Sequence, residues 1–260
     1  MSDLYLLRNA LKDMIGLKKV VAAIILIALP TAIALIWRAT APASQFSAET
    51  AYNTLCSGLV FGFTLVILSV VFGTGVIAQE VEQKTIVYLL TRPVPRWRIA
   101  LVKFLAAVIA TTVTVWIASV LLALATYGPG GLAHSRLGRD LLILPVGVLA
   151  YTALFLLLAT MMNRPLIVGL LFAFLWESWV PNLPGNFQKL SLMAYLRVLA
   201  PHPKPESTTV DLSDLLNTLN PQTITMPLAW GVLAAVIVAA LALALLVFSA
   251  REYAPREDAE

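Results

Sequence analysis

Long uninterrupted runs of apolar residues dominate this chain. Six of these runs carry at most one charged residue each, and they lie at residues 20–37, 55–78, 100–126, 141–162, 165–180 and 227–250. A helix that crosses a bilayer needs about 20 apolar residues, whereas a membrane strand would alternate apolar and polar positions. The runs do not alternate, and a lone strand would leave its backbone amides unpaired in lipid. We therefore predict six transmembrane helices and an all-α fold.

The composition indicates one polytopic membrane domain over residues 1–260. Apolar residues make up 60% of the chain and charged residues only 12%, whereas a soluble domain has about 25% charged residues. Three stretches outside the apolar runs are long enough to have a structure of their own. They lie at residues 1–19, 79–99 and 181–226.

The basic residues predict the orientation. Twelve of the 18 lysines and arginines fall before the first run, in the stretch 79–103 that leads into the third run, between the fourth and fifth runs, or after the sixth. Since cytoplasmic loops are enriched in these residues, both termini should face the cytoplasm of a multi-pass protein in the cell inner membrane. Tryptophans near the opposite helix ends support this orientation, since tryptophan is enriched at membrane–water interfaces. They are Trp37, Trp176, Trp179 and Trp230.

Residues 1–19 have the pattern of an amphipathic helix on the inner membrane surface. The apolar residues share one helical face and are Leu4, Leu7, Leu11, Met14 and Ile15. Lysines on this stretch would lie near anionic lipid headgroups. Two hypotheses remain open, a simple tether and a contact with a cytoplasmic partner.

The outer segment 181–226 is too long and too apolar for a plain connection. Its first half predicts a short helix over 187–199 at the outer interface, ending before Pro201. A second short helix is predicted over 212–219, and Asn220 and Pro221 would stop it.

Sequence motifs of enzymes are missing from the chain. It has no nucleophile elbow, no zinc-binding His-Glu-x-x-His and no phosphate-binding loop. Cys56 is the single cysteine and matches no metal-ligand spacing, while His134 and His202 fall in outer loops. We expect no catalytic residue, no cofactor, no metal and no nucleic-acid partner, and any ATP must be used by another polypeptide.

Two acidic residues lie near the predicted spans, Asp140 and Glu177. Asp140 starts the fourth span and has Arg139 as a basic neighbour. Glu177 stands among aromatic residues four positions before Pro181, near the outer end of the fifth span. Buried carboxylates in membranes are costly and often functional. Glu177 is therefore either a structural carboxylate with a partner or a group that lines or gates a substrate path.

The segment 79–99 joins the second and third spans on the basic side. Residues 79–91 favour a short helix in which Glu80 and Lys84 form an i,i+4 pair. Arg92 precedes Pro93, which ends the helix there. A stiff helix between two spans can pass a push from a soluble partner into the membrane. The alternative is a solvated connector whose basic residues only fix the orientation.

This segment resembles the membrane subunits of ABC transporters of the type-2, exporter-like class. The family pattern has an acidic residue, a threonine, a Leu-Leu pair, a proline, an arginine and a lysine. The matching residues are Glu80, Thr85, Leu89, Leu90, Pro93, Arg96 and Lys103. The chain departs from the pattern at Lys84 and Pro95. The resemblance implies a coupling helix over 79–91 that docks on an ATPase subunit, with Glu82 among its coupling residues.

The same resemblance implies a non-catalytic permease subunit of an ATP-driven exporter. Two ATP-binding subunits and a second permease subunit, most simply an identical one, would complete the complex within the membrane lipid. Two other functions stay open. One is a mechanical component that drives an outer partner protein without moving solute, and the other is an ion-coupled carrier that uses Glu177.

Overall fold

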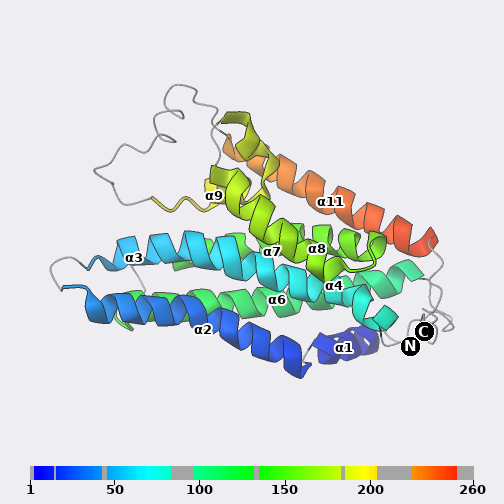
Figure 1. Ribbon diagram of the computed structural model, residues 1–260, viewed down its shortest axis with the longest axis horizontal. Helices are drawn as coiled ribbons and strands as arrows, with labels where there is room; N and C mark the ends of the chain where they lie inside the picture. The colour runs from blue at the N-terminus through cyan, green and yellow to red at the C-terminus, as the bar shows by residue number, and fades with distance from the viewer. Residues whose placement is uncertain are drawn as a thin grey trace.

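The computed structural model is built of helices packed side by side (Figure 1). The structure describes residues 3–14, 16–42, 46–82, 96–131, 135–182, 185–203 and 224–250. Every regular element within these ranges is a helix, which confirms the predicted all-α class for the described residues.

Five helices in the described residues are long and apolar enough to cross a membrane. They are Lys19–Thr40, Ala48–Val76, Trp97–Tyr127, Leu137–Met161 and Met226–Ala250. The sixth predicted span, 165–180, is instead a shorter apolar helix over Pro165–Glu177. At a rise of about 1.5 Å per residue, this helix is shorter than the roughly 30 Å of hydrocarbon in a bilayer. Multiple apolar helices are thus present, but the structure does not establish a sixth full span.

The helices α2, α4, α6 and α7 run in alternating directions and α11 runs in the same direction as α7, so the bundle has two ends (Figure 1). We call one the α1 end, after the helix α1 (Asp3–Met14), and the other the α3 end, after α3 (Ala48–Leu55). The long helices are α2 (Leu17–Thr40), α4 (Val66–Glu82), α6 (Arg96–Tyr127), α7 (Leu137–Met161) and α11 (Met226–Ala250).

Shorter elements complete the bundle. A π-helix, η1 (Cys56–Leu65), joins α3 to α4, and α8 (Pro165–Leu171) continues into a second π-helix, η3 (Phe172–Glu177). Two 3-10 helices, η4 (Val180–Asn182) and η5 (Gly185–Leu190), lead to α9 (Leu192–Leu199). Of the predicted outer helices, the stretch 187–199 thus holds part of η5 and α9, whereas 212–219 lies outside the described residues.

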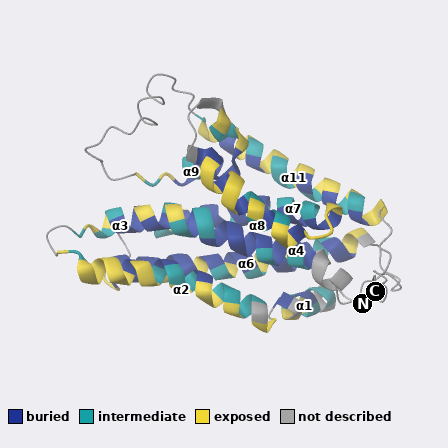
Figure 2. Ribbon diagram, viewed as in Figure 1, coloured by how far each residue is buried: buried dark blue, intermediate teal, exposed yellow. Residues whose placement is uncertain are grey.

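The core lies where α4, α6 and α7 meet (Figure 2). α2 packs on α6 at one side of this core, and α11 packs on α7 at the other. In the most apolar window of α2 and of α11, only 22% of the residues are buried, against 67% in the span Ala48–Val76. Large apolar side chains therefore point outward from both flanks, as with Val238 and Leu246 of α11. Such a surface suits contact with lipid or with another membrane helix.

Two glycines allow close contact around α4. A Cβ at Gly73 of α4 would lie 3.1 Å from Phe155 Cβ of α7. A Cβ at Gly169 of α8 would lie 2.9 Å from Val70 Cγ1 of α4. Any larger residue at these positions would push the helices apart, so glycine holds α7 and α8 tightly against α4.

A proline in α2 leaves a carbonyl free, and a neighbouring helix satisfies it. Pro30 has no N–H, so the carbonyl of Leu26, four residues earlier, has no intrahelical donor. The hydroxyl of Thr64 in η1 donates to that oxygen over 3.2 Å. The hydrogen bond fixes η1 against α2 in a fully buried position.

The proline in α7 also leaves a carbonyl free, and a neighbouring helix satisfies it. Pro145 removes the donor for the carbonyl of Leu141. The indole Nε1 of Trp116 in α6 donates to that oxygen over 2.9 Å. An unpaired backbone carbonyl is costly in lipid. The neighbouring helix must therefore keep its donor at this carbonyl, and in this way each proline fixes the packing of the helix beside it.

Candidate functional site

The middle of the predicted coupling segment, residues 83–95, lies outside the described residues. It includes four of the predicted coupling residues, Thr85, Leu89, Leu90 and Pro93. α4 ends at Glu82 and α6 begins at Arg96, both at the α1 end (Figure 1). Glu80 and Glu82 therefore lie in the last turn of α4, and Arg96 is the first residue of α6. The side-chain roles of these residues remain predictions.

α1 packs against α6, which begins at the end of the coupling segment. Ala10 and Met14 are buried, while Arg8 and Lys12 on the opposite face are exposed. The amphipathic helix α1 therefore turns part of its apolar face toward the protein. The ammonium of Lys19 lies 3.6 Å from the sulfur of Met14, which holds the start of α2 near the end of α1.

Glu177, at the end of η3, points into the protein and is only 3% exposed. Its Oε1 accepts hydrogen bonds from the hydroxyl of Tyr151 in α7 and from the backbone N–H of Met193, the latter over 2.7 Å. Ser191 caps α9 and also accepts from the Met193 N–H, over 3.1 Å. The positive end of a helix dipole favours a carboxylate there. Glu177 thus joins η3, α7 and the start of α9.

A cation on α9 accompanies this carboxylate. Burial lowers the pKa of Arg197, and the nearby Tyr151 and Glu177 act in the opposite direction. An arginine stays protonated at physiological pH even so. The other carboxylate oxygen of Glu177 is buried without a hydrogen-bond partner among the described residues. A positive charge close by therefore compensates a carboxylate that is otherwise only half satisfied.

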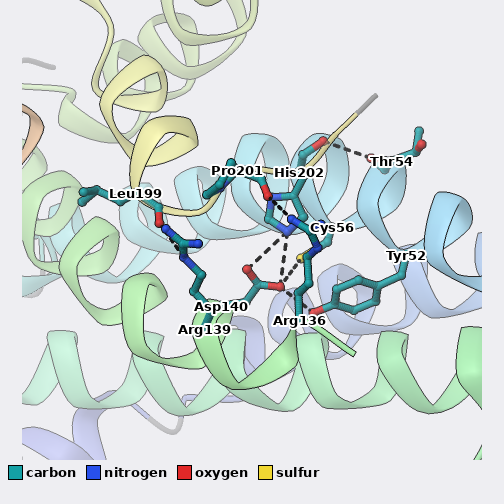
Figure 3. Close-up of polar contacts among 10 residues, drawn as sticks. Tyr52, Thr54, Cys56, Arg136, Arg139, Asp140, Leu199, Pro201 and His202 are labelled. Carbon is teal, nitrogen blue, oxygen red and sulfur yellow. Dashed lines mark hydrogen bonds and ion pairs between the residues drawn. The ribbon is translucent and has the colours of Figure 1, made fainter. Parts of the chain in front are cut away.

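The other end of α9 is held by two arginines from the beginning of α7 (Figure 3). Arg139 donates from Nε to the carbonyl of Leu199 over 2.9 Å. Arg136 donates to the carbonyl of Pro201 over 3.0 Å. Basic side chains suit these positions, because the last carbonyls of a helix lack backbone donors. The sequence suggests Arg139 as the neighbour of Asp140, but it binds the end of α9 instead.

Asp140 lies at the centre of a buried polar group that we call the Asp140 cluster, formed with Tyr52, Cys56 and His202 (Figure 3). Its Oδ2 accepts from the hydroxyl of Tyr52 over 2.7 Å and lies 3.7 Å from the Sγ of Cys56. The Nε2 of His202 lies 3.2 Å from Oδ1 and 3.3 Å from Oδ2. The cluster therefore joins α3, η1, α7 and the segment after α9.

No local sequence pattern indicates the Asp140 cluster. Cys56 and His202 lie 84 and 62 residues from Asp140, and no short motif contains them. The one local signal is the four-residue spacing of Tyr52 and Cys56, which places both on one helical face. A helix pair and the turn after α9 have to pack before the four groups meet.

The sequence profile described as ABC-2 family transporter protein matches residues 5–253. The chain belongs to the ABC-2 transporter family. Its resemblance to ABC transporter membrane subunits is thereby confirmed, and this ABC-2 protein is a multi-pass permease subunit of an ABC transporter. Such a subunit works together with an ATP-binding subunit. No single curated protein matches the chain.

Proposed function

We propose that this ABC-2 permease couples ATP hydrolysis on a separate subunit to the export of a substrate across the membrane. One observation carries the proposal: the segment with the family pattern joins α4 to α6, and both helices belong to the packed core. A force on that segment would enter two core helices at once. The permease itself would supply no catalytic residue.

The packing suggests how a movement of the coupling segment would spread through the bundle. α4 packs on α7 and α8, and α6 packs on α2, α7 and α1. Closure of the ATP-binding subunits would push the coupling residues and tilt α4 and α6 together. Packed helices respond by moving between discrete arrangements rather than by bending continuously. The bundle would then alternate between two states.

Glu177 acts in this scheme as a positioning residue. Its carboxylate holds η3, α7 and α9 together, so a displacement of α7 carries α9 with it. α9 would thereby open or close the exit for the substrate at the α3 end. These contacts support the structural hypothesis for Glu177, and the gating role then belongs to α9 as a whole.

The orientation and the assembly belong to the same proposal. The α1 end would face the cytoplasm of a cell with an inner membrane, since the basic residues gather in the predicted inner stretches. Two ATP-binding subunits and two permease subunits, most simply identical ones, would form the complex. The exposed apolar sides of α2 and α11 offer surface for lipid and for the second permease.

Purification in mild detergent tests the coupling. We expect an ATP-binding subunit to co-purify with the wild-type permease and to be lost in Glu80→Arg and Leu89→Asp. Glu49→Arg is the matched control, because Glu49 is exposed at the α3 end and should not affect attachment. A permease that transports its substrate without any ATP-binding subunit would disprove the proposal.

A mechanical function is the second hypothesis. α9 is bonded to α7 at one end and to η3 at the other, so the bundle could transmit movement to an outer partner protein instead of moving solute. Reconstitution in vesicles separates the two functions. Solute that accumulates on ATP addition supports export, whereas ATP hydrolysis stimulated only by an outer protein supports the mechanical function.

A further inference from the structure

We propose that Cys56, Asp140 and His202 form a binding site for a zinc ion. The three side chains each offer one ligand atom, and these atoms all lie within 4.8 Å of one another. They come from three separate parts of the chain: η1, the first turn of α7 and the segment after α9. The proposal is independent of the ATPase coupling, because it concerns the opposite end of the bundle.

The distances suit tetrahedral zinc. With ordinary bond lengths, such an ion holds a sulfur and an oxygen about 3.5 Å apart, and a nitrogen and an oxygen about 3.3 Å apart. The Oδ2 of Asp140 lies 3.7 Å from the Sγ of Cys56 and 3.3 Å from the Nε2 of His202. The remaining pair, the Sγ of Cys56 and the imidazole nitrogen of His202, lies within 4.8 Å.

The charges of the cluster balance those of a zinc ion. Asp140 and Cys56 are 1% and 0% exposed, and a carboxylate at such a depth needs an opposite charge or hydrogen-bond donors. One thiolate, one carboxylate and one neutral imidazole around Zn²⁺ have no net charge. Binding replaces the thiol proton of Cys56 with the S–Zn bond and releases that proton to the solvent.

The donor set also selects the metal. A thiolate and an imidazole favour Zn²⁺ over Mg²⁺ or Ca²⁺, which prefer oxygen ligands. The hydroxyl of Tyr52 donates to Asp140 over 2.7 Å and would orient the carboxylate toward the ion. The ring of Phe61 lies 5.6 Å from that of His202 and limits its rotation.

Bound zinc would fix the exit end of the bundle. The residues that follow α9 would be tied to α7 and η1 by metal–ligand bonds in addition to the hydrogen bonds of Arg136 and Arg139. Because the ion binds only the folded arrangement, zinc should stabilise the protein. The site thus makes the position of α9 depend on metal.

Equilibrium dialysis of the detergent-purified full chain against Zn²⁺, after chelation, tests the site. We expect one zinc ion per chain, and at least about tenfold weaker binding in Cys56→Ser and His202→Gln. His134→Gln is the matched control, because His134 is the only other histidine, and it should bind like wild type. Undiminished binding in both cluster variants, or equal loss in the control, would overturn the proposal.

A spectroscopic measurement on the wild-type protein tests the site even if the variants fail to fold. Co²⁺ in place of zinc should show the charge-transfer absorption of a cobalt–thiolate bond, which only Cys56 can provide, because it is the only cysteine. Absence of this band, or no metal bound at all, would disprove the site. Co-purification of the ATP-binding subunit is scored separately, so failure here leaves the coupling proposal intact.

Discussion

The backbone N–H of Met193 donates a hydrogen bond of 2.7 Å to the carboxylate of Glu177, sixteen residues earlier in the chain. Through this bond the first turn of α9 is fixed to the last residue of η3, while the hydroxyl of Tyr151 fixes the same carboxylate to α7. One side chain therefore sets the relative position of three helical elements near the α3 end.

Removal of this carboxylate should destabilise the protein. Glu177→Ala leaves the buried hydroxyl of Tyr151 without its acceptor and leaves the N–H of Met193 with Ser191 alone, at a cost of about 1–3 kcal/mol. Thermal unfolding in detergent should show a melting temperature lower by several degrees. Glu49→Ala is the control, because the side chain of Glu49 is 63% exposed and its loss should have almost no effect.

Glu177→Gln, by contrast, keeps an oxygen that can accept both hydrogen bonds. We expect its stability and transport to stay close to those of the wild type. If transport is lost while the ATP-binding subunit remains attached, the ion-coupled carrier with Glu177 as the protonatable group gains support.

A pair of glycine substitutions in α7 tests the contact with α9. A Cβ at Gly147 would lie 2.9 Å from Leu196 Cδ1 and 3.1 Å from Leu65 Cδ1, and both leucines are fully buried. Gly147→Ala should therefore cost about 1–3 kcal/mol through overpacking. Gly138→Ala in the same helix meets nothing within 4 Å, so it should be neutral or stabilising. Equal melting temperatures for the two variants would contradict the described packing.

The hydrogen bond from Thr64 to Leu26 should matter only because of Pro30. Thr64→Val keeps the shape but leaves the Leu26 carbonyl unpaired, which should cost about 1–2 kcal/mol. In a Pro30→Ala background the helix supplies its own donor to this carbonyl. The double-mutant cycle on unfolding free energies should then show a smaller cost for Thr64→Val. Independent effects of the two substitutions would argue against this role for Thr64.

Cysteine labelling on intact cells tests the orientation. Gly16→Cys lies at the α1 end and Glu49→Cys at the α3 end, and both positions are exposed. A membrane-impermeant maleimide should label only Glu49→Cys, whereas permeabilised cells should show both. The native Cys56 is fully buried and should stay unlabelled in the wild type, which serves as the blank. The reverse pattern would place the coupling segment outside the cell and exclude ATP-driven coupling there.

A charge on the buried face of α1 tests the role of this helix. Ala10 is only 4% exposed, so Ala10→Asp buries a carboxylate and should release α1 from α6 with a lower melting temperature. We expect weaker attachment of the ATP-binding subunit as well, since α1 and the start of α6 share one end of the bundle. Arg8→Gln, on the exposed face, is the control. Normal attachment in a destabilised Ala10→Asp would make α1 a tether only.

The sequence by itself determined the helical class, the places of the long apolar helices and the family. These features are local: hydrophobic length and the absence of alternation depend on neighbouring residues, and the segment 79–99 keeps its pattern within a short stretch. The amphipathic face of α1 could be read off in the same way. Its packing on α6 could not, because lipid and protein cover an apolar face equally well.

The tertiary structure decided which groups meet. Three hydrogen bonds join residues that are far apart in the sequence. Glu177 and Tyr151 are separated by 26 residues, Thr64 and Leu26 by 38, and Asp140 and Tyr52 by 88. A buried polar group must find a partner, but hydropathy does not specify which of the distant groups will reach it. Only the packing of the helices brings these particular donors and acceptors within a few ångströms, because each contact depends on the positions of at least two separate elements.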